Sequence, residues 1–148
     1  MRSELTRILL ADDDEDDRII FKDAFAEIKI KTFIQTVNNG IELMEHLNQP
    51  DLLIPHILFL DLNMPRKNGI DCLKEMKQID RLKDMVVAIY STSASEENIE
   101  ETFVFGANIY INKPSDFETL KKVLSEVTVI NWQYRTSALN RDNFLLRI

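Results

Sequence analysis

Charged and hydroxyl side chains follow four apolar runs of this sequence, each at the point where the run ends. They are Asp12 and Asp13 after the first run, Asp61 after the third, Ser91 after the fourth and Lys113 after the fifth. Carboxylates that lie close together repel one another, and a hard divalent cation such as Mg²⁺ relieves that repulsion with oxygen ligands. A carboxylate in such a site can attack a phosphoryl group, while the metal and a lysine neutralise the transferred oxygens. The pattern is therefore typical of Mg²⁺-dependent phosphoryl transfer, provided that the run ends meet in space.

The apolar runs predict five strands, at residues 7–11, 31–37, 56–60, 85–90 and 108–112. Apolar residues at helical spacing separate them, and the first helix is predicted to bury Ile19, Ile20, Ala24, Phe25 and Ile28. The first, third and fourth runs are almost continuously apolar, which is typical of strands buried on both faces of a parallel sheet. Strands that alternate with helices in this way predict an α/β fold with a doubly wound parallel sheet, whose functional groups lie at the carboxyl ends of the strands.

The length and composition favour one globular domain, which we expect to span residues 1–130. Residues 131–148 show no clear periodicity, so we expect a C-terminal tail or cap and no output domain. Its apolar side chains could pack back on the domain; they are Trp132, Tyr134, Phe144 and Leu145.

The formal net charge of −7 argues against nucleic acid or an anionic membrane as a partner. The single cysteine excludes an internal disulfide and a cysteine-based zinc site. No signal-peptide pattern and no long apolar run is present, so we expect a cytoplasmic protein.

The acidic run at residues 12–17 has structural interpretations as well. Acidic residues before a helix cap its first turn and interact favourably with its dipole, so we expect residues 14–17 to be mostly solvated first-turn residues. The spacing of Asp12, Asp14 and Asp16 also suggests a Ca²⁺ loop, but Asp17 stands where that loop needs glycine. Lys113, taken alone, is better explained as a surface lysine after an edge strand.

Taken together, four segments resemble the receiver domains of two-component response regulators. The segments are ILLADDDEDD (8–17), LFLDLNMPRKNGIDCL (58–73), AIYSTSASEEN (88–98) and GANIYINKP (106–114). The similarity extends from about residue 7 to residue 127. It implies a flavodoxin-like fold, in which five parallel strands have the order 2-1-3-4-5 and helices cover both faces of the sheet.

The resemblance also implies which residues bind metal and accept phosphate. Asp61 corresponds to the phosphoacceptor of the family. The Mg²⁺ ligands would be Asp13 directly, Asp12 mainly through water, Asp61, and the backbone carbonyl of Asn63.

Further positions match residues that bind or report the phosphoryl group. Ser91 and Lys113 would each contact a phosphoryl oxygen, and Tyr110 would change rotamer on phosphorylation. The bond between Lys113 and Pro114 would be cis. Gly69 suits a backbone position of positive φ or of close approach.

The function that the resemblance implies is a phosphorylation-dependent signalling switch. A histidine kinase or a phosphotransfer protein would supply the phosphoryl group, and an unidentified downstream protein would read the result. The chain would then catalyse only its own phosphorylation and dephosphorylation.

Three alternatives stay open at this point. The first is a pseudo-receiver that acts as an interaction module without phosphorylation. The second is a haloacid-dehalogenase-like phosphatase, because Asp12 and Asp14 mimic its paired acids. The third and weakest is a flavin binder, whose phosphate loop should not be acidic.

Overall fold

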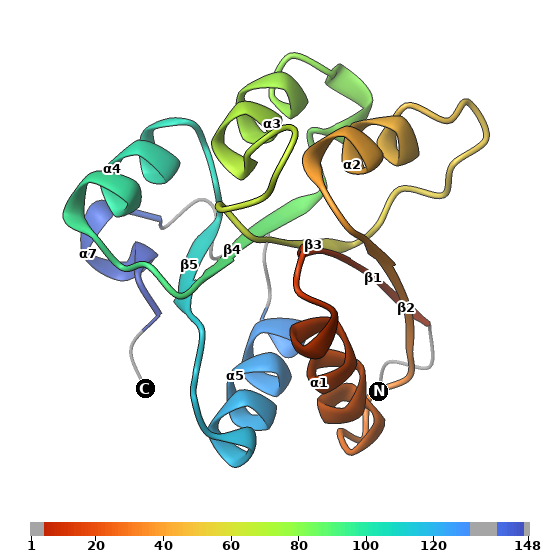
Figure 1. Cartoon of the computed structure of the whole chain (residues 1–148), viewed down its shortest axis with the longest axis vertical. Coiled ribbons are helices and arrows are strands. Elements are labelled where there is room, and N and C mark those ends of the chain that lie inside the picture. The colour runs from red at the N-terminus through yellow and green to blue at the C-terminus, as the bar shows by residue number, and fades with distance from the viewer. Residues whose placement is uncertain (1–4, 131–138, 147–148) are drawn as a thin grey trace.

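The computed structural model describes residues 5–130 and 139–146, and it contains one five-stranded parallel sheet (Figure 1). The strand order is β2-β1-β3-β4-β5, as predicted. The strands are β1 (Thr6–Ala11), β2 (Thr32–Val37), β3 (Ile57–Leu60), β4 (Val86–Ser91) and β5 (Ile109–Asn112). Each strand begins and ends within one residue of the predicted range. The carboxyl ends agree with the prediction in all strands but β4, which extends one residue further, to Ser91.

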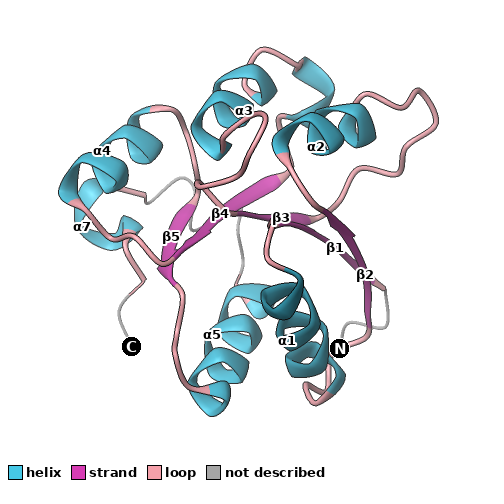
Figure 2. Ribbon diagram, in the orientation of Figure 1, coloured by secondary structure: helices cyan, strands magenta, loops and turns pink. Residues whose placement is uncertain are grey.

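Helices cover both faces of the sheet, with α1 and α5 on one side and α2, α3 and α4 on the other (Figure 2). They are α1 (Glu15–Ala26), α2 (Gly40–Leu47), α3 (Gly69–Met76), α4 (Glu96–Val104), α5 (Phe117–Val129) and the short α7 (Arg141–Phe144), with a 3₁₀ turn at Asp80–Leu82. Each of these α-helices begins after an Asp, Asn or Ser whose side chain accepts a hydrogen bond from a backbone N–H of the first turn. The caps therefore fix where each helix starts after its strand. Among the described residues, no helix is both long enough and apolar enough to cross a lipid bilayer.

The core forms two layers because successive strand residues face opposite sides of the sheet. In β1, Leu9 and Ala11 pack with α2, α3 and α4, whereas Ile8 and Leu10 pack with α1 and α5. All residues of β3 and β4 are buried. This agrees with the prediction that the apolar runs are strands covered on both faces.

The predicted buried face of the first helix was partly wrong. Ile19 and Ile20 are 51% and 43% exposed, while Phe21 is fully buried. The Phe21 ring packs edge-on against Phe59 of β3 and Tyr90 of β4. These two ring contacts determine which face of α1 is buried. Periodicity alone could not decide this, because Ile19, Ile20 and Phe21 are consecutive apolar residues.

The described part of the C-terminal segment packs against α4 and β5. Phe144 of α7 is fully buried, with its ring next to those of Phe103 and Tyr110. The Leu146 N–H donates a hydrogen bond to the Tyr110 carbonyl oxygen at 2.9 Å, which places this segment along the open edge of β5. Arg141 forms ion pairs with two glutamates of α4. Trp132 and Tyr134, the other side chains that could pack back on the domain, lie outside the described residues.

We predict that Phe144→Ala lowers the free energy of unfolding by about 3–5 kcal/mol, because it leaves a cavity between α4 and β5. Val104→Ala, at the end of α4, is the control, since Val104 is 64% exposed; its effect should stay within about 0.5 kcal/mol. Urea unfolding followed by circular dichroism measures both. Equal effects of the two substitutions would show that Phe144 does not contribute to the core.

Candidate functional site

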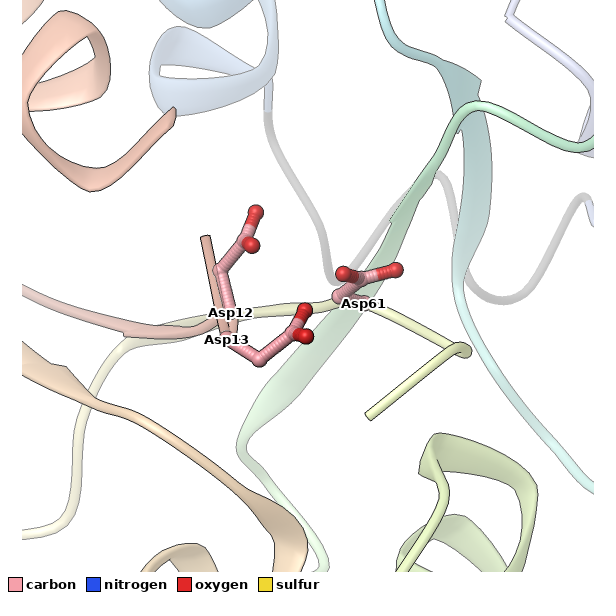
Figure 3. A group of neighbouring side chains, drawn as sticks. All are labelled: Asp12, Asp13 and Asp61. Atoms are coloured by element: carbon pink, nitrogen blue, oxygen red, sulfur yellow. The ribbon is translucent and has the colours of Figure 1, made fainter. Parts of the chain in front are cut away.

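Three carboxylates meet at the carboxyl ends of β1 and β3 (Figure 3). One oxygen from each of Asp12, Asp13 and Asp61 can be chosen so that all lie within 4.8 Å of one another. Asp12 is fully buried and Asp61 is 5% exposed, whereas Asp13 is exposed. The site is therefore a shallow acidic cluster with two covered members and one that faces solvent.

The register of the sheet brings these acids together. Ala11 pairs with Leu60, and the Asp61 N–H donates to the Ala11 carbonyl at 3.0 Å, so the residues that follow each strand are neighbours. The close approach predicted for Gly69 is confirmed, since a Cβ there would lie 2.3 Å from the Asp61 carbonyl oxygen. Its φ is not positive. Glycine is thus needed because α3 begins directly against the backbone of Asp61.

Lys113 brings a positive charge to the cluster from the end of β5. Its Nζ lies 2.8 Å from Asp12 Oδ2, 2.8 Å from Asp17 Oδ2 and 3.7 Å from Asp61 Oδ2. It also lies 5.1 Å from the centre of the Tyr90 ring. The side chain is only 9% exposed. Lys113 is thus a buried counter-ion of the acids, not a surface lysine.

Residues 14–17 were expected to be mostly solvated residues at the first helical turn; residues 14–16 are exposed, and Asp17 is the exception. Its carboxylate is only 35% exposed and pairs with Lys113. The sequence signal for this contact is weak: Asp17 lies one helical turn after Asp13, on the side of α1 that can face the strand ends.

Ser91 and Tyr110 lie on neighbouring strands beside the acids. Ser91 ends β4 and is fully buried, and its Oγ accepts a hydrogen bond from the Ser93 N–H at 3.2 Å. Tyr110 is also fully buried, so its ring is in an inward position. Its hydroxyl donates to the Ser93 carbonyl oxygen. The loop after β4 therefore links the two side chains.

Comparison with known proteins identifies the family to which these residues point. The family model for the response regulator receiver domain matches residues 8–125, which is most of the chain. The chain belongs to this family.

The receiver domain is similar to proteins of known identity over most of its length. It is 31% identical to chemotaxis protein CheY-3 of Vibrio cholerae, over 82% of this chain and 90% of that protein. The structure of the phosphorylated cyanobacterial phytochrome response regulator RcpA superposes with a TM-score of 0.79 at 27% identity, covering 93% of this chain and 98% of that one. The Mn²⁺-bound form of response regulator Rcp1 gives a TM-score of 0.75 at 26% identity, covering 82% and 91%.

Burial dominates the electrostatics of the receiver's acids. It raises the pKa of Asp61 to about 6; Lys113 opposes the shift, while Asp12 adds to it. Burial also raises the pKa of Asp12, against the hydrogen bonds from Lys113 and the Asp14 N–H. For Lys113, burial disfavours the ammonium, but the hydrogen bonds to Asp12 and Asp17 prevail and raise its pKa. The acids therefore carry more negative charge than one lysine balances.

The donor set fits a hard divalent cation. Asp12, Asp13 and Asp61 offer grouped carboxylate oxygens, the ligand type that Mg²⁺ prefers. Asp13 and Asn63 line the same hollow, of about 550 Å³, beside the cluster. Receiver domains bind a divalent metal at an acidic cluster of this kind.

The cis peptide expected between Lys113 and Pro114 is not found: the described residues contain no cis peptide bond. The trans isomer is intrinsically favoured before proline by about 0.5–1 kcal/mol. In the trans form the Lys113 N–H donates to the Ser91 carbonyl oxygen at 2.8 Å, and its ammonium still reaches Asp12.

We predict that Asp61→Asn stabilises the metal-free receiver at pH 7.5 by about 2–3 kcal/mol. The usual pKa of Asp is 3.8, and that of Asp61 is about 6 in the folded protein. Because the folded protein holds this proton more tightly, the stability that Asp61 contributes is complete below pH 3.8 and is lost as the pH rises through 6. Asparagine cannot ionise, so the variant avoids that loss and the two proteins should converge near pH 4.

Denaturant unfolding in EDTA at several pH values measures this difference. Asp51→Asn, which removes an exposed acid, is the control and should change little. An Asp61→Asn variant that is less stable at pH 7.5, or a difference that does not vary with pH, would contradict the burial of an ionised carboxylate.

Proposed function

We propose that this receiver is a phosphorylation-dependent switch and that Asp61 accepts the phosphoryl group. The observation that carries the proposal is the position of Asp61: its carboxylate oxygens lie among those of Asp12 and Asp13, and one lies 3.7 Å from the Lys113 ammonium. A nearly buried nucleophile thus has a cation site and a fixed positive charge beside it. Phosphoryl transfer needs little more than such positioning and charge neutralisation.

In the proposed reaction, an Asp61 carboxylate oxygen attacks the phosphorus of a phosphohistidine or of an acyl phosphate. The new O–P bond forms as the donor's P–N or P–O bond breaks, and the leaving group keeps the bonding electrons. Asp13, Asp61, the Asn63 carbonyl and, through water, Asp12 would hold Mg²⁺, which supplies charge neutralisation when bound. Lys113 and Ser91 would each contact a phosphoryl oxygen.

Loss of the phosphoryl group resets the switch. Water attacks the phosphorus, the O–P bond to Asp61 breaks, and inorganic phosphate leaves. The Asn63 side chain, which borders the same hollow as Asp13, is suited to contact that water. We propose that the chain turns over no separate substrate.

The proposed conformational signal passes through the loop after β4. If the Ser91 side chain changes rotamer to donate its hydroxyl to a phosphoryl oxygen, Oγ moves away from the Ser93 N–H that now donates to it. Ser93 also accepts the hydroxyl hydrogen bond of Tyr110, so the position of this loop and the rotamer of Tyr110 are coupled. Such a local charge change can bias a two-state element.

The proposed partners are a histidine kinase or phosphotransfer protein as donor and a downstream protein as reader, in the cytoplasm. The proposed domain comprises residues 1–130, with residues 131–148 as a C-terminal tail or cap. The signal would leave by protein–protein contact.

We predict that Mg²⁺ and acetyl phosphate add one phosphoryl group to the protein, and that Asp61→Asn abolishes this gain because the attacking oxygen is lost. Intact mass spectrometry measures it. EDTA should prevent the gain in the wild type, and Asp51→Asn should react like the wild type. A wild-type protein that neither gains mass nor binds Mg²⁺ in calorimetry would be a pseudo-receiver.

A further inference from the structure

The ammonium of Lys113 is shared between two acids of different character. Its Nζ is 2.8 Å from both Asp12 and Asp17, but 3.7 Å from Asp61. Asp12 follows β1 and is fully buried, whereas Asp17 lies in the first turn of α1 and is partly exposed. In this arrangement Lys113 is bonded to two acids, and neither of them is the proposed phosphoacceptor.

We propose that Asp17 is a positioning residue that holds Lys113 back from the phosphoryl group on Asp61. This inference rests on the proposed function. Two of the three N–H donors of the ammonium serve Asp12 and Asp17, and the third is available to a phosphoryl oxygen. The two short contacts, however, hold Nζ 3.7 Å from Asp61 Oδ2. In the proposed switch, Lys113 moves toward the phosphoryl group and lengthens one of these two contacts.

Asp17 is the partner that Lys113 can leave at lower cost. Asp12 is completely buried, so loss of its counter-ion would strand a charge away from water. The Asp17 carboxylate is 35% exposed, and both it and Lys113 line a cavity of about 380 Å³ beside α1 and the start of α5. Water can therefore solvate Asp17 once the lysine has moved, which makes this ion pair the releasable one.

The sign of the effect follows from charge. In the resting protein the ion pair with Asp17 stabilises Lys113 in its present position. That stabilisation is lost when Lys113 moves to the phosphoryl group, so Asp17 disfavours the phosphorylated state. Asp17→Asn keeps the size of the side chain and removes the competing charge.

The test measures the affinity for beryllofluoride, a phosphoryl mimic, on the full chain with saturating Mg²⁺, by ¹⁹F NMR. Asp17→Asn should bind it roughly three- to fivefold more tightly, the upper part of the range expected for a partly exposed ion pair. Asp16→Asn is the matched control: it removes the same charge from the same helical turn, but at an exposed position. Its affinity should stay within about twofold of the wild type.

A double-mutant cycle tests whether Asp17 acts through Lys113. In a Lys113→Ala background, Asp17→Asn should no longer tighten binding. Persistence of the tightening there, an equal effect of Asp16→Asn, or unchanged or weaker binding by Asp17→Asn would each overturn the inference. Circular dichroism melts identify any variant that is unfolded, and Asp17→Ser then replaces Asp17→Asn.

The two proposals fail in different ways. If the wild type binds beryllofluoride and Asp61→Asn does not, the proposed phosphoacceptor stands whatever Asp17→Asn does. If the wild type shows no binding, or Asp61→Asn binds equally well, the proposed function falls and this inference falls with it.

Discussion

The balance of charge around the Lys113 ammonium is the constraint on which the site depends. Three carboxylates, those of Asp12, Asp17 and Asp61, lie 2.8–3.7 Å from the ammonium of a lysine that is 9% exposed, and Asp13 adds a fourth to the cluster beside Asp12 and Asp61. One positive charge cannot compensate them, and burial adds to the cost of keeping them ionised. The excess negative charge suits the site to a dication. The parallel sheet maintains this arrangement, because three strand ends and the first turn of α1 bring these groups to one edge.

The sequence predicts the strands well for a physical reason. Three of the five strands are buried on both faces, so each is a short, almost continuous apolar run with polar residues directly after it. The strand ends, and hence the meeting of Asp12, Asp61 and Lys113, follow from that pattern. The helices are harder to orient: Ile19, Ile20 and Phe21 are all apolar, and only the neighbouring rings of the sheet favour Phe21.

The contact between Asp17 and Lys113 could not be read from the sequence because a local explanation already accounted for the acid. An aspartate in the first turn of a helix is favourable by itself. The two residues are 96 positions apart, and the pairing depends on how α1 is rotated against β5. The burial of Phe21 determines that rotation. The packing of Phe21, which periodicity did not predict, therefore also brings Asp17 to Lys113.

Strand β5 joins the site to the C-terminal segment. Lys113 follows its carboxyl end, three residues after Tyr110, whose ring packs in the core layer on the side of α2, α3 and α4. Phe144 covers that ring, and the Leu146 N–H is bonded to the Tyr110 carbonyl. A change in the Tyr110 rotamer must therefore repack Phe144, because both side chains are fully buried and a close-packed core leaves no free space between them. The segment that closes the edge of β5 thus lies where it can respond to the site.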